Sequence, residues 1–219
     1  MKFLLIILAL FVLSCAGTKK DVEKNVAGGT SEETNTLASS NVVPVVGRDG
    51  HNVTAVAFNN PNSYISSMEH GEKFSAAVAF DISVWLKIDS LPQKSGTPHN
   101  LIGKFSDASA IVPSEFSLAI VNGACGTEEA AFAFFFEDGS SNVDCGQALL
   151  SNKTIQAGKW IYVQAKWDGR YLTLYQDGVA VAKEERISAA MPYSRLPVYL
   201  GKSQVHFAID GISFNTEAL

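Results

Sequence analysis

Apolar and polar residues alternate most regularly between Gly158 and Ala182. A period of two predicts β-strands that have one buried face and one more exposed face. The dipeptides Asp168-Gly169 and Asp177-Gly178 interrupt the alternation, and Asp-Gly favours the positive φ angles that tight hairpins need. We therefore expect three short antiparallel strands in this stretch. Their inward residues are predicted to be Ile161, Val163, Ala165, Trp167, Leu172 and Leu174.

Other stretches predict further strands of the same core. Phe80–Ile88 alternates in the same way, and burial of its apolar residues would contribute about 1.5 to 3 kcal/mol per side chain before entropy is counted. Phe116–Ile120 also alternates, and Ala131–Phe136 holds four phenylalanines in six residues, which predicts a strand covered on both faces. Two weaker runs within Val53–Ile65, around an Asn- and Pro-rich turn, are the predicted first strands.

Five blocks of sequence, in order along the chain, resemble laminin-G-like domains, which belong to the concanavalin-A-like jelly-roll sandwiches. The G-K-W run at Gly158 and the W-D-G and Y-Q-D-G hairpins after it carry the resemblance most clearly. The resemblance covers residues 41–219 and implies an all-β fold, a jelly-roll sandwich of two antiparallel sheets, with the sandwich domain at 42–219. The other four blocks are AFNNPNSYI (57–65), FDISVWLKIDSLP (80–92), LPVYLGKS (196–203) and AIDGISFNTEAL (208–219).

The N-terminus has the pattern of an export signal. Lys2 is followed by eleven apolar residues, a run too short for a hydrocarbon core of about 30 Å at about 1.5 Å per residue. It predicts a secretory signal peptide over residues 1–14. The order Val12-Leu13-Ser14-Cys15-Ala16 resembles a bacterial lipobox, which implies that Cys15 carries lipid and anchors the protein in the cell envelope. Analogy with enterobacterial sorting points to the outer membrane, and the alternative is an ordinary signal peptide with an incidental cysteine.

Residues 15–41 are predicted to form a lipidated N-terminus and a flexible tether. The segment lacks aromatic residues and is rich in Gly, Ser, Thr, Asn, Lys and Glu, so it cannot bury enough apolar surface to offset its ordering entropy. Its root-mean-square span would be about 25 to 30 Å. The alternative, an irregular cap packed on the sandwich, applies to its last few residues.

The number of cysteines fits an exported lipoprotein. The chain has three cysteines, and lipidation of Cys15 leaves Cys125 and Cys145 to form a disulfide. Closing a loop of about twenty residues would stabilise the fold by roughly 3 kcal/mol in the chain-entropy model. Metal ligation is the weaker alternative, because the two thiols have no histidine nearby in the sequence.

Aromatic residues on the strand faces opposite the predicted core are the candidate ligand contacts. These residues are Trp85, Tyr162 and Tyr175. Aromatic rings suit sugar recognition because they offer a large apolar face with little rotamer entropy to lose. The alternative is that the rings pack beneath neighbouring strands or loops.

The family resemblance also implies one structural Ca²⁺ ion. Many laminin-G-like domains hold calcium near the turn after the first strands and near the Asp of the last strand, which correspond here to Asn59 and Asp210. Calcium prefers several carboxylate ligands, and Asn59 stands where the family often has Asp, so we expect reduced affinity. The alternative is that Asp210 accepts hydrogen bonds from the neighbouring turn.

The sequence contains no familiar pattern of catalytic residues. Related glucanases place carboxyl groups on one strand face with the pattern E-x-D-x-x-E, which is absent here, as is a G-x-S-x-G elbow. A polysaccharide lyase built from dispersed Tyr, His and Arg is the enzymatic alternative. Removal of residues 1–14 takes Lys2 from the 17 basic residues and leaves 16 against 22 acidic ones, a net charge of −6. No basic stripe remains, which argues against nucleic acid as a partner.

Together these features predict an envelope lipoprotein that binds its partner and is not an enzyme. The family resemblance implies adhesion to, or recognition of, a carbohydrate or an envelope or extracellular protein. The alternative from another class is a structural lipoprotein that holds a partner in an envelope assembly. A polysaccharide-degrading enzyme is the weaker third alternative.

Overall fold

The computed structural model of the 219-residue chain describes most of the residues after Thr36. The chain divides into two units, Met1–Asn35 and Thr36–Leu219, and every described residue belongs to the second. No helix within the described ranges is long and apolar enough to cross a membrane. These ranges are 37–104, 115–136, 148–187, 190–191 and 194–218.

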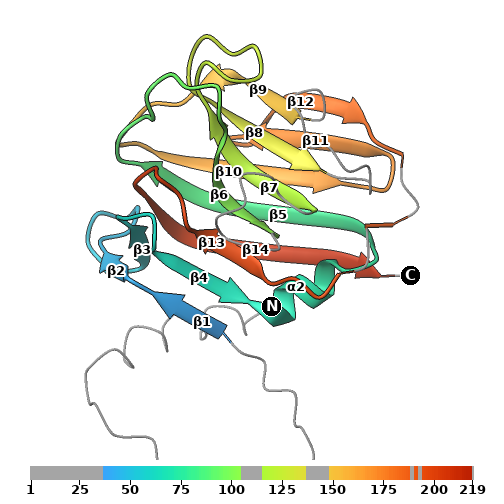
Figure 1. Ribbon diagram of the computed structural model, residues 1–219, viewed down its shortest axis with the longest axis horizontal. Helices are drawn as coiled ribbons and strands as arrows, with labels where there is room; N and C mark the ends of the chain where they lie inside the picture. Colours follow the sequence, from blue (N-terminus) through green and yellow to red (C-terminus); the bar gives the residue numbers. More distant parts are fainter. Residues whose placement is uncertain (1–36, 105–114, 137–147, 188–189, 192–193, 219) are drawn as a thin grey trace, which may run out of the picture. The chain divides into compact units, whose positions relative to one another are not determined.

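The domain is a sandwich of two seven-stranded antiparallel sheets, which confirms the predicted all-β jelly-roll class (Figure 1). A short helix, α2 (Met68–Phe74), leads from β4 to β5. Sheet A has the strand order β1 (Leu37–Ser40), β4 (Tyr64–Ser67), β13 (Val198–Gly201), β6 (His99–Lys104), β7 (Phe116–Val121), β8 (Ala131–Phe136), β9 (Ala148–Thr154). Sheet B has the order β12 (Val179–Glu185), β11 (Tyr171–Gln176), β10 (Trp160–Trp167), β5 (Ala77–Ile88), β14 (Phe207–Ala218), β3 (Ala55–Phe58), β2 (Val42–Val45).

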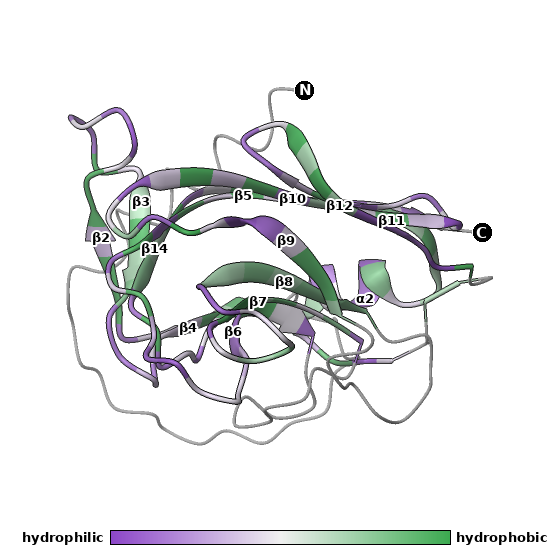
Figure 2. Ribbon diagram, turned by 90° about the horizontal axis from the view of Figure 1, so that it is seen from above, coloured by the Kyte–Doolittle hydropathy of each residue, from purple (hydrophilic) through white to green (hydrophobic). Residues whose placement is uncertain are grey.

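The core lies between the two sheets because the strands alternate as the sequence predicts. Along β5, every second residue from Phe80 to Ile88 is at most 2% exposed, and the residues between them are partly exposed. Figure 2 shows the two sheets as separate layers, with hydrophobic residues recurring along the strands. The predicted inward residues of β10 and β11 are all in the core: Ile161, Val163, Ala165, Trp167, Leu172 and Leu174.

Trp167 joins the two sheets at the end of β10. Its ring centroid lies 5.1 Å from that of Phe136 in sheet A and 5.8 Å from that of Phe80 in sheet B. Its indole Nε1 donates a hydrogen bond of 2.9 Å to the carbonyl of Arg186. The only polar atom of this fully buried side chain is therefore satisfied.

Two turns confirm the predicted β10–β11–β12 meander. Asp177, with φ 52°, and Gly178, with φ 77°, both have the left-handed backbone that a type I′ turn requires. In the preceding turn Gly169 has φ 85°. There Asp168 Oδ1 accepts the backbone N–H of Arg170 at 3.0 Å, so the Asp-Gly sequence supplies both the side-chain acceptor and the backbone freedom.

The ordered domain begins earlier than the sequence analysis predicted. Residues 37–40 were assigned to the tether, but they form β1 and pair with β4. Asn41, with φ 51°, takes the chain from β1 in sheet A to β2 in sheet B. Composition misled here because β1 is mostly exposed and is held by backbone pairing. The prediction also placed Val53 in a strand, but it lies in the loop before β3 and is 49% exposed.

The predictions for the cysteines stay open. Cys15 and Cys145 lie outside the described residues, as do the signal peptide and most of the predicted tether. Lipidation of Cys15 and the Cys125–Cys145 disulfide are therefore still predictions. Cys125 itself lies after β7, has φ 54° and packs against the apolar outer side of sheet A.

Strand β8 is buried on both faces, as its four phenylalanines predict. Phe132, Phe134 and Phe136 point into the core between the sheets. The alternate residues of β7 and β8 form a second apolar cluster on the outer side of sheet A. We call this cluster the covered face, and its members are Ala119, Val121, Ala124, Ala131, Ala133 and Phe135.

A buried ion pair joins the end of β6 to the start of β7. Lys104 Nζ lies 2.8 Å from Glu115 Oε2, and the two side chains are 0% and 1% exposed. The ammonium group also donates to Ser75 Oγ at 3.0 Å and to the Ser194 carbonyl at 3.2 Å. Because Ser75 caps the C-terminal end of α2, the pair also fixes the helix to sheet A. The sequence analysis did not foresee it.

Candidate functional site

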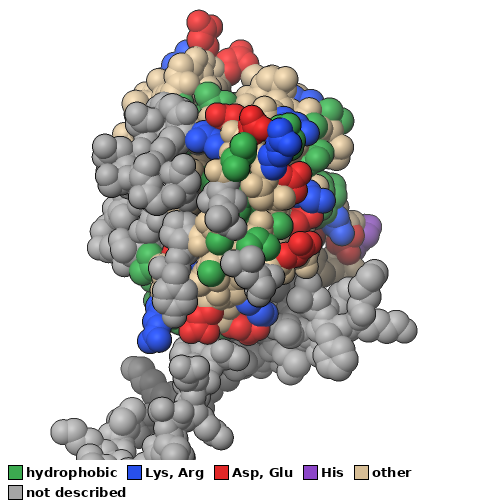
Figure 3. Space-filling view, turned by 90° about the vertical axis from the view of Figure 1, so that its right-hand side faces the viewer, with side chains coloured by type: hydrophobic (Ala, Val, Ile, Leu, Met, Phe, Trp, Pro, Cys, Tyr) green, Lys and Arg blue, Asp and Glu red, His purple; other side chains and the backbone are tan. Residues whose placement is uncertain are grey.

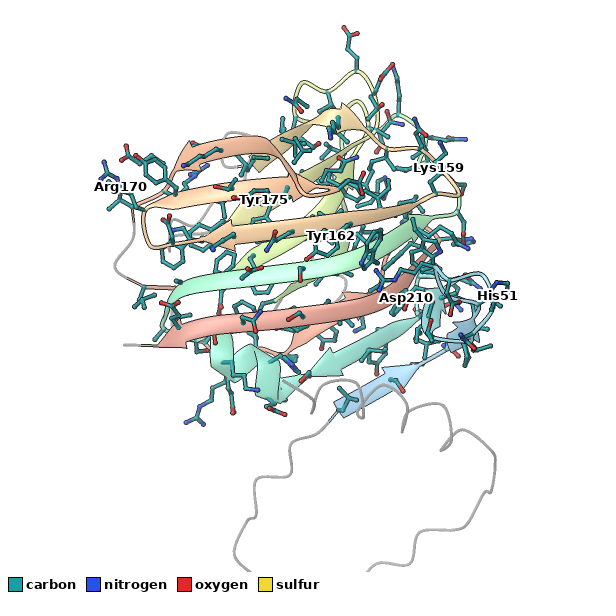
Figure 4. The ribbon with its side chains drawn as sticks, turned by 180° about the vertical axis from the view of Figure 1, so that it is seen from behind. His51, Lys159, Tyr162, Arg170, Tyr175 and Asp210 are labelled. Atoms are coloured by element: carbon teal, nitrogen blue, oxygen red, sulfur yellow. The ribbon has the colours of Figure 1, made fainter. Side chains whose placement is uncertain are left out.

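The outer side of sheet B carries a row of partly exposed aromatic rings. Tyr162 on β10 stands directly opposite Trp85 on β5, and Trp160 lies two residues before Tyr162 on the same side of β10. Tyr175 on β11 pairs with Gln164 and is therefore diagonal to Tyr162. We call Trp85, Trp160, Tyr162 and Tyr175 the aromatic face. Figure 4 shows Tyr162 and Tyr175 on adjacent strands, so the structure brings the three predicted ligand contacts together.

Within the aromatic face, Trp85 packs beneath a loop. The guanidinium of Arg48 lies over the Trp85 ring, 4.7 Å from its centroid, and the Tyr162 ring is 5.2 Å away. Asp210 holds Arg48 in place, because its Oδ2 accepts the Arg48 backbone N–H at 2.8 Å and lies 3.9 Å from Nε. Of the two alternatives for Trp85, the structure shows packing under a loop.

The loop that carries Arg48, residues 46–54, is shaped by its own hydrogen bonds. Asp49 accepts the backbone N–H of Asn52 at 2.9 Å and its side-chain N–H at 2.6 Å. Hydrogen bonds to the ionised form, with the Asn52 backbone N–H as the largest cause, lower the pKa of Asp49. A Cβ on Gly47 would lie 2.6 Å from Asp210 Oδ2 and still closer to Thr54 Oγ1, so a larger residue there would force these side chains to shift.

A cavity of about 480 Å³ lies at the end of the aromatic face. Its volume is within the range of small-molecule sites, about 300 to 1,000 Å³. Trp160 forms one wall, between the end of β9 and the start of β10. A hydrogen bond of 3.1 Å from Ser151 Oγ to Gln176 Oε1 links β9 of sheet A to β11 of sheet B beside it. Six other lining residues are polar and exposed or partly exposed: Asn152, Lys153, Thr154, Gln156, Lys159 and Asp177.

The cavity combines an apolar ring with polar side chains. Asp177 Oδ1 accepts the backbone N–H of Tyr162 at 3.0 Å, so this carboxylate is fixed at the cavity's edge. Lys87 Nζ lies over the Trp160 ring, 5.5 Å from its centroid. Figure 4 shows Lys159 at this end of the face and Arg170 at the opposite end. The arrangement can stack a flat apolar surface and hydrogen-bond its polar edges.

The sequence analysis missed Trp160 as a site residue. The available signal was that Trp160 belongs to the same alternating set as Tyr162 and therefore shares its face. No such signal existed for Lys153 and Lys159, because only the approach of β9 to β10 places them around one cavity.

The two residues predicted to hold calcium are not brought together. Phe58 pairs with Phe207 and Val56 with Ile209, so Asn59 and Asp210 lie beyond opposite ends of the β3–β14 pairing. Four residue positions along a strand correspond to about 13 Å. Asp210 instead accepts a hydrogen bond from the neighbouring loop, which was the alternative. Within the described ranges, no three His, Cys, Asp or Glu side chains are grouped as metal ligands.

A second cavity, of about 380 Å³, lies on the same side of sheet B and contains carboxylates. Both oxygens of Asp81 accept Gln164 Nε2, at 2.8 and 2.9 Å. Asp168 caps the turn after β10, and the backbone N–H of Tyr171, as the largest cause, lowers its pKa. A general acid needs a raised pKa, so Asp168 does not have the property of a glycosidase acid.

Charged groups of both signs are interspersed at the end of the molecule that Figure 3 shows. Among the described residues on this side, Lys and Arg alternate with Asp and Glu and form no continuous basic surface. Binding to nucleic acid would require such a surface, because phosphate contacts supply most of the affinity. The expectation that nucleic acid is not a partner stays a prediction.

A family model described as the concanavalin A-like lectin/glucanases superfamily matches residues 58–218. The matched range contains the whole aromatic face and all the residues that line the cavity beside Trp160. No curated protein matches the sequence.

Solved structures of binding domains share the fold at low sequence identity. The binding domain of Paraclostridial Mosquitocidal Protein 1 has a TM-score of 0.63 at 15% identity, over 84% of this chain and 45% of that chain. A structure of botulinum neurotoxin type C, whose cell entry depends on two ganglioside molecules, has a TM-score of 0.59 at 11% identity, over 84% and 44%. This chain therefore spans less than half the length of these two toxin chains.

A third structure matches over most of both chains. Domain 4 of AbnA, a GH43 extracellular arabinanase from Geobacillus stearothermophilus, was determined in complex with arabinotriose. Its TM-score is 0.54 at 13% identity, over 84% of this chain and 83% of that domain. At these identities the three likenesses show a shared fold.

Proposed function

We propose that this chain, which belongs to the concanavalin A-like lectin/glucanase superfamily, binds carbohydrate in the cavity beside Trp160 without cleaving it. The observation that carries the proposal is that Trp160, which is partly exposed, lines a cavity of about 480 Å³ together with several polar residues. Two proteins with this fold that interact with carbohydrate support the proposal. The AbnA domain was determined in complex with arabinotriose, and cell entry of the neurotoxin depends on interaction with two ganglioside molecules.

The cavity offers the two kinds of contact that a sugar needs. The C–H face of a sugar ring is apolar and can stack on the indole of Trp160, which loses little rotamer entropy on binding. The hydroxyl groups at the ring's edge need hydrogen-bond partners, and Asn152, Thr154 and Gln156 supply amide and hydroxyl groups there. Stacking would supply affinity and the polar side chains would fix orientation.

The remaining aromatic face suits further sugar units of a longer chain. Tyr162 follows Trp160 on the same side of β10, at a spacing of about 6.6 Å for two residues of a strand. Tyr175 continues the row on β11. Trp85 acts as a support for Tyr162, because Arg48 lies over it.

Binding without cleavage is supported by the state of the nearby carboxylates. Asp177 accepts a backbone hydrogen bond at the edge of the cavity. Asp81 accepts two contacts from Gln164, and Asp168 caps a turn. Each of these acids therefore has a structural partner. A glycosidase instead needs two carboxyl groups that flank the same glycosidic bond.

The test is a panel of neutral and acidic polysaccharides, offered to the full-length protein in calorimetric titrations. Trp160→Ala should weaken binding about tenfold or more, which corresponds to about 1.4 kcal/mol. Tyr171→Ala is the matched control, because its ring is also partly exposed on the outer side of sheet B and has Lys183 Nζ 4.2 Å from its centroid. The Tyr171→Ala variant should leave binding unchanged, because Tyr171 begins β11 and the cavity lies at the opposite end of that strand, beside Gln176.

Two results would overturn the proposal. One is that Trp160→Ala and Tyr171→Ala weaken binding equally. The other is the release of new reducing ends from a bound polysaccharide, which would make the protein an enzyme. Unfolding midpoints of both variants show whether a loss of binding follows from a loss of structure.

We also infer that Cys15 carries a lipid anchor that attaches the domain to the cell envelope, and to the outer membrane by analogy. The lipobox-like order Leu13-Ser14-Cys15-Ala16 supports this inference. One acyl chain binds a membrane only marginally, so stable attachment needs the several chains of a bacterial lipoprotein. Cys15→Ala should move the protein out of the membrane fraction. Retention of the alanine variant in membranes after a salt wash would place the anchor elsewhere.

A further inference from the structure

The charges around the cavity indicate the class of saccharide that it takes. The whole chain has a formal net charge of −5. Lys153 and Lys159 nevertheless line the cavity, and Lys87 Nζ lies 5.5 Å from the centroid of the Trp160 ring. A local excess of positive charge on an acidic protein raises the local concentration of anionic ligands.

The three lysines come from separate parts of the fold. Lys153 belongs to β9 of sheet A, and Lys87 belongs to β5 of sheet B, where it stands directly opposite Trp160. Lys159 lies in the turn before β10, where the Gly158 N–H donates to the Ile88 carbonyl at 2.7 Å and fixes the turn against β5. The positive charge is therefore gathered by tertiary structure and is not a run of basic sequence.

Acidic side chains do not neutralise these lysines. None of the salt bridges within the described part of the chain involves Lys87, Lys153 or Lys159. The carboxylate that lines the cavity is Asp177, and its Oδ1 is engaged by the Tyr162 N–H. Asp89, which follows β5, is not among the lining residues. The lining residues thus carry two ammonium groups, those of Lys153 and Lys159, against one carboxylate, and Lys87, outside the lining, adds its ammonium group over the Trp160 ring.

We propose that the cavity binds an acidic polysaccharide, with one sugar ring on Trp160 and its carboxylate or sulfate group among Lys87, Lys153 and Lys159. This inference rests on the proposed function. The ammonium of Lys87 over the indole is a cation–π contact that a neutral sugar on the same ring face would displace without replacement. An anionic sugar gives the displaced ammonium a charged partner in its place.

The test compares polysaccharides that share a backbone and differ in charge. The full-length protein is titrated with polygalacturonic acid and with its methyl ester, and with dextran sulfate and dextran, at about 50 mM and about 500 mM NaCl. We expect at least one acidic form to bind about tenfold tighter than its neutral partner at low salt, and this preference to shrink at high salt. The two pairs distinguish a carboxylate from a sulfate ligand.

Substitutions of lysine test which residues cause the preference for acidic polysaccharides. Lys153→Gln combined with Lys159→Gln should remove most of the difference between the acidic and the neutral form. Lys166→Gln is the matched control, because Lys166 is an exposed lysine on the outer side of the same strand as Trp160 and lies outside this cavity. It should leave the preference intact.

The outcomes separate this inference from the proposed function. Equal binding of both acidic forms and their neutral partners, or binding of neutral polysaccharides alone, overturns the acidic ligand and leaves carbohydrate binding standing. A charge preference that persists in the double variant overturns the assignment to Lys153 and Lys159. Binding to none of the polysaccharides overturns both proposals.

Discussion

The two outer faces of the sandwich are built on the same alternation of residues, yet their surroundings differ. On the covered face of sheet A, Ala119 and Ala133 are 0% exposed and Phe135 is 3% exposed. On the aromatic face of sheet B, all four rings are partly exposed. The ion pairs follow the same division, since Lys104–Glu115 in sheet A is 0% and 1% exposed and Arg48–Asp210 beside sheet B is 51% and 11% exposed.

This difference shows which face a ligand can reach. Small side chains such as Ala119 and Ala133 make a flat surface on which other parts of the protein can pack closely. Large rings such as Trp160 and Tyr162 stand on the outer side of the sheet, and Trp160 also lines the cavity. The covered face therefore contributes to stability, and the aromatic face offers surface to a partner.

The largest expected effect is the loss of a ring from the covered face. Phe135→Ala should lower the free energy of unfolding by about 3 to 5 kcal/mol, because the ring is almost fully buried. Tyr175→Ala, which removes a partly exposed ring from the aromatic face, should cost less than about 1.5 kcal/mol. Urea unfolding of both variants measures the contrast. Equal losses would mean that the two faces are equally covered.

The ion pairs give the next largest contrast. Glu115→Gln should lower the free energy of unfolding by about 3 kcal/mol, because it leaves the Lys104 ammonium buried beside a neutral partner. Glu185→Gln is the control, since it breaks a pair with Arg170 in which both side chains are exposed, and should cost less than about 1 kcal/mol. A similar small effect at Glu115 would show that water reaches Lys104.

A smaller effect is expected from the loop over Trp85. Arg48→Ala should lower the free energy of unfolding by about 1 kcal/mol, because it removes a cation–π contact and a half-exposed ion pair. It should also change the tryptophan fluorescence of the folded protein. Arg170→Ala removes a guanidinium from over Tyr171 at 5.2 Å and should leave that fluorescence unchanged. An unaltered spectrum for Arg48→Ala would mean that Arg48 does not rest on Trp85 in solution.

The smallest effect concerns pH and the helix that contacts both sheets. Burial of His70 on α2, as the largest cause, lowers its pKa from its usual value near 6.5. The unfolded chain then binds more protons than the folded one as pH falls through about 6.5, so stability is present above that pH and is lost on acidification. His70→Asn should make the unfolding midpoint fall less steeply between about pH 7.5 and pH 5.5. Equal slopes would contradict the assignment to His70.

Burial also lowers the pKa of His99, so this residue contributes to the slope with the same sign. A separate His99→Asn variant measures its share. The two histidines lie on different elements and share no described partner, since His70 contacts Ser67 and Phe214 and His99 contacts Ser95, so their effects on the slope should add.

Much of the strand pattern was predictable because alternation is a local property. The core residues of β5 and β10, the double burial of β8 and the Asp-Gly turns were all predicted from it and are confirmed. The start of the domain was not, because β1 is held by pairing with β4, and composition does not record pairing. The predicted pairing of Asn59 with Asp210 as calcium ligands was missed for a related reason, because the β3–β14 register separates the two residues.

The sequence by itself determined which side chains share a strand face, because a period of two places Trp160 with Tyr162 and Trp85 with Lys87 wherever the strands lie. Only the tertiary structure decided which face is covered and which is open. It also placed Lys153 of β9 beside Trp160, laid Arg48 over Trp85 and paired Lys104 with Glu115. These contacts join residues on different strands and loops, and a local pattern of hydrophobicity does not determine which strands and loops meet.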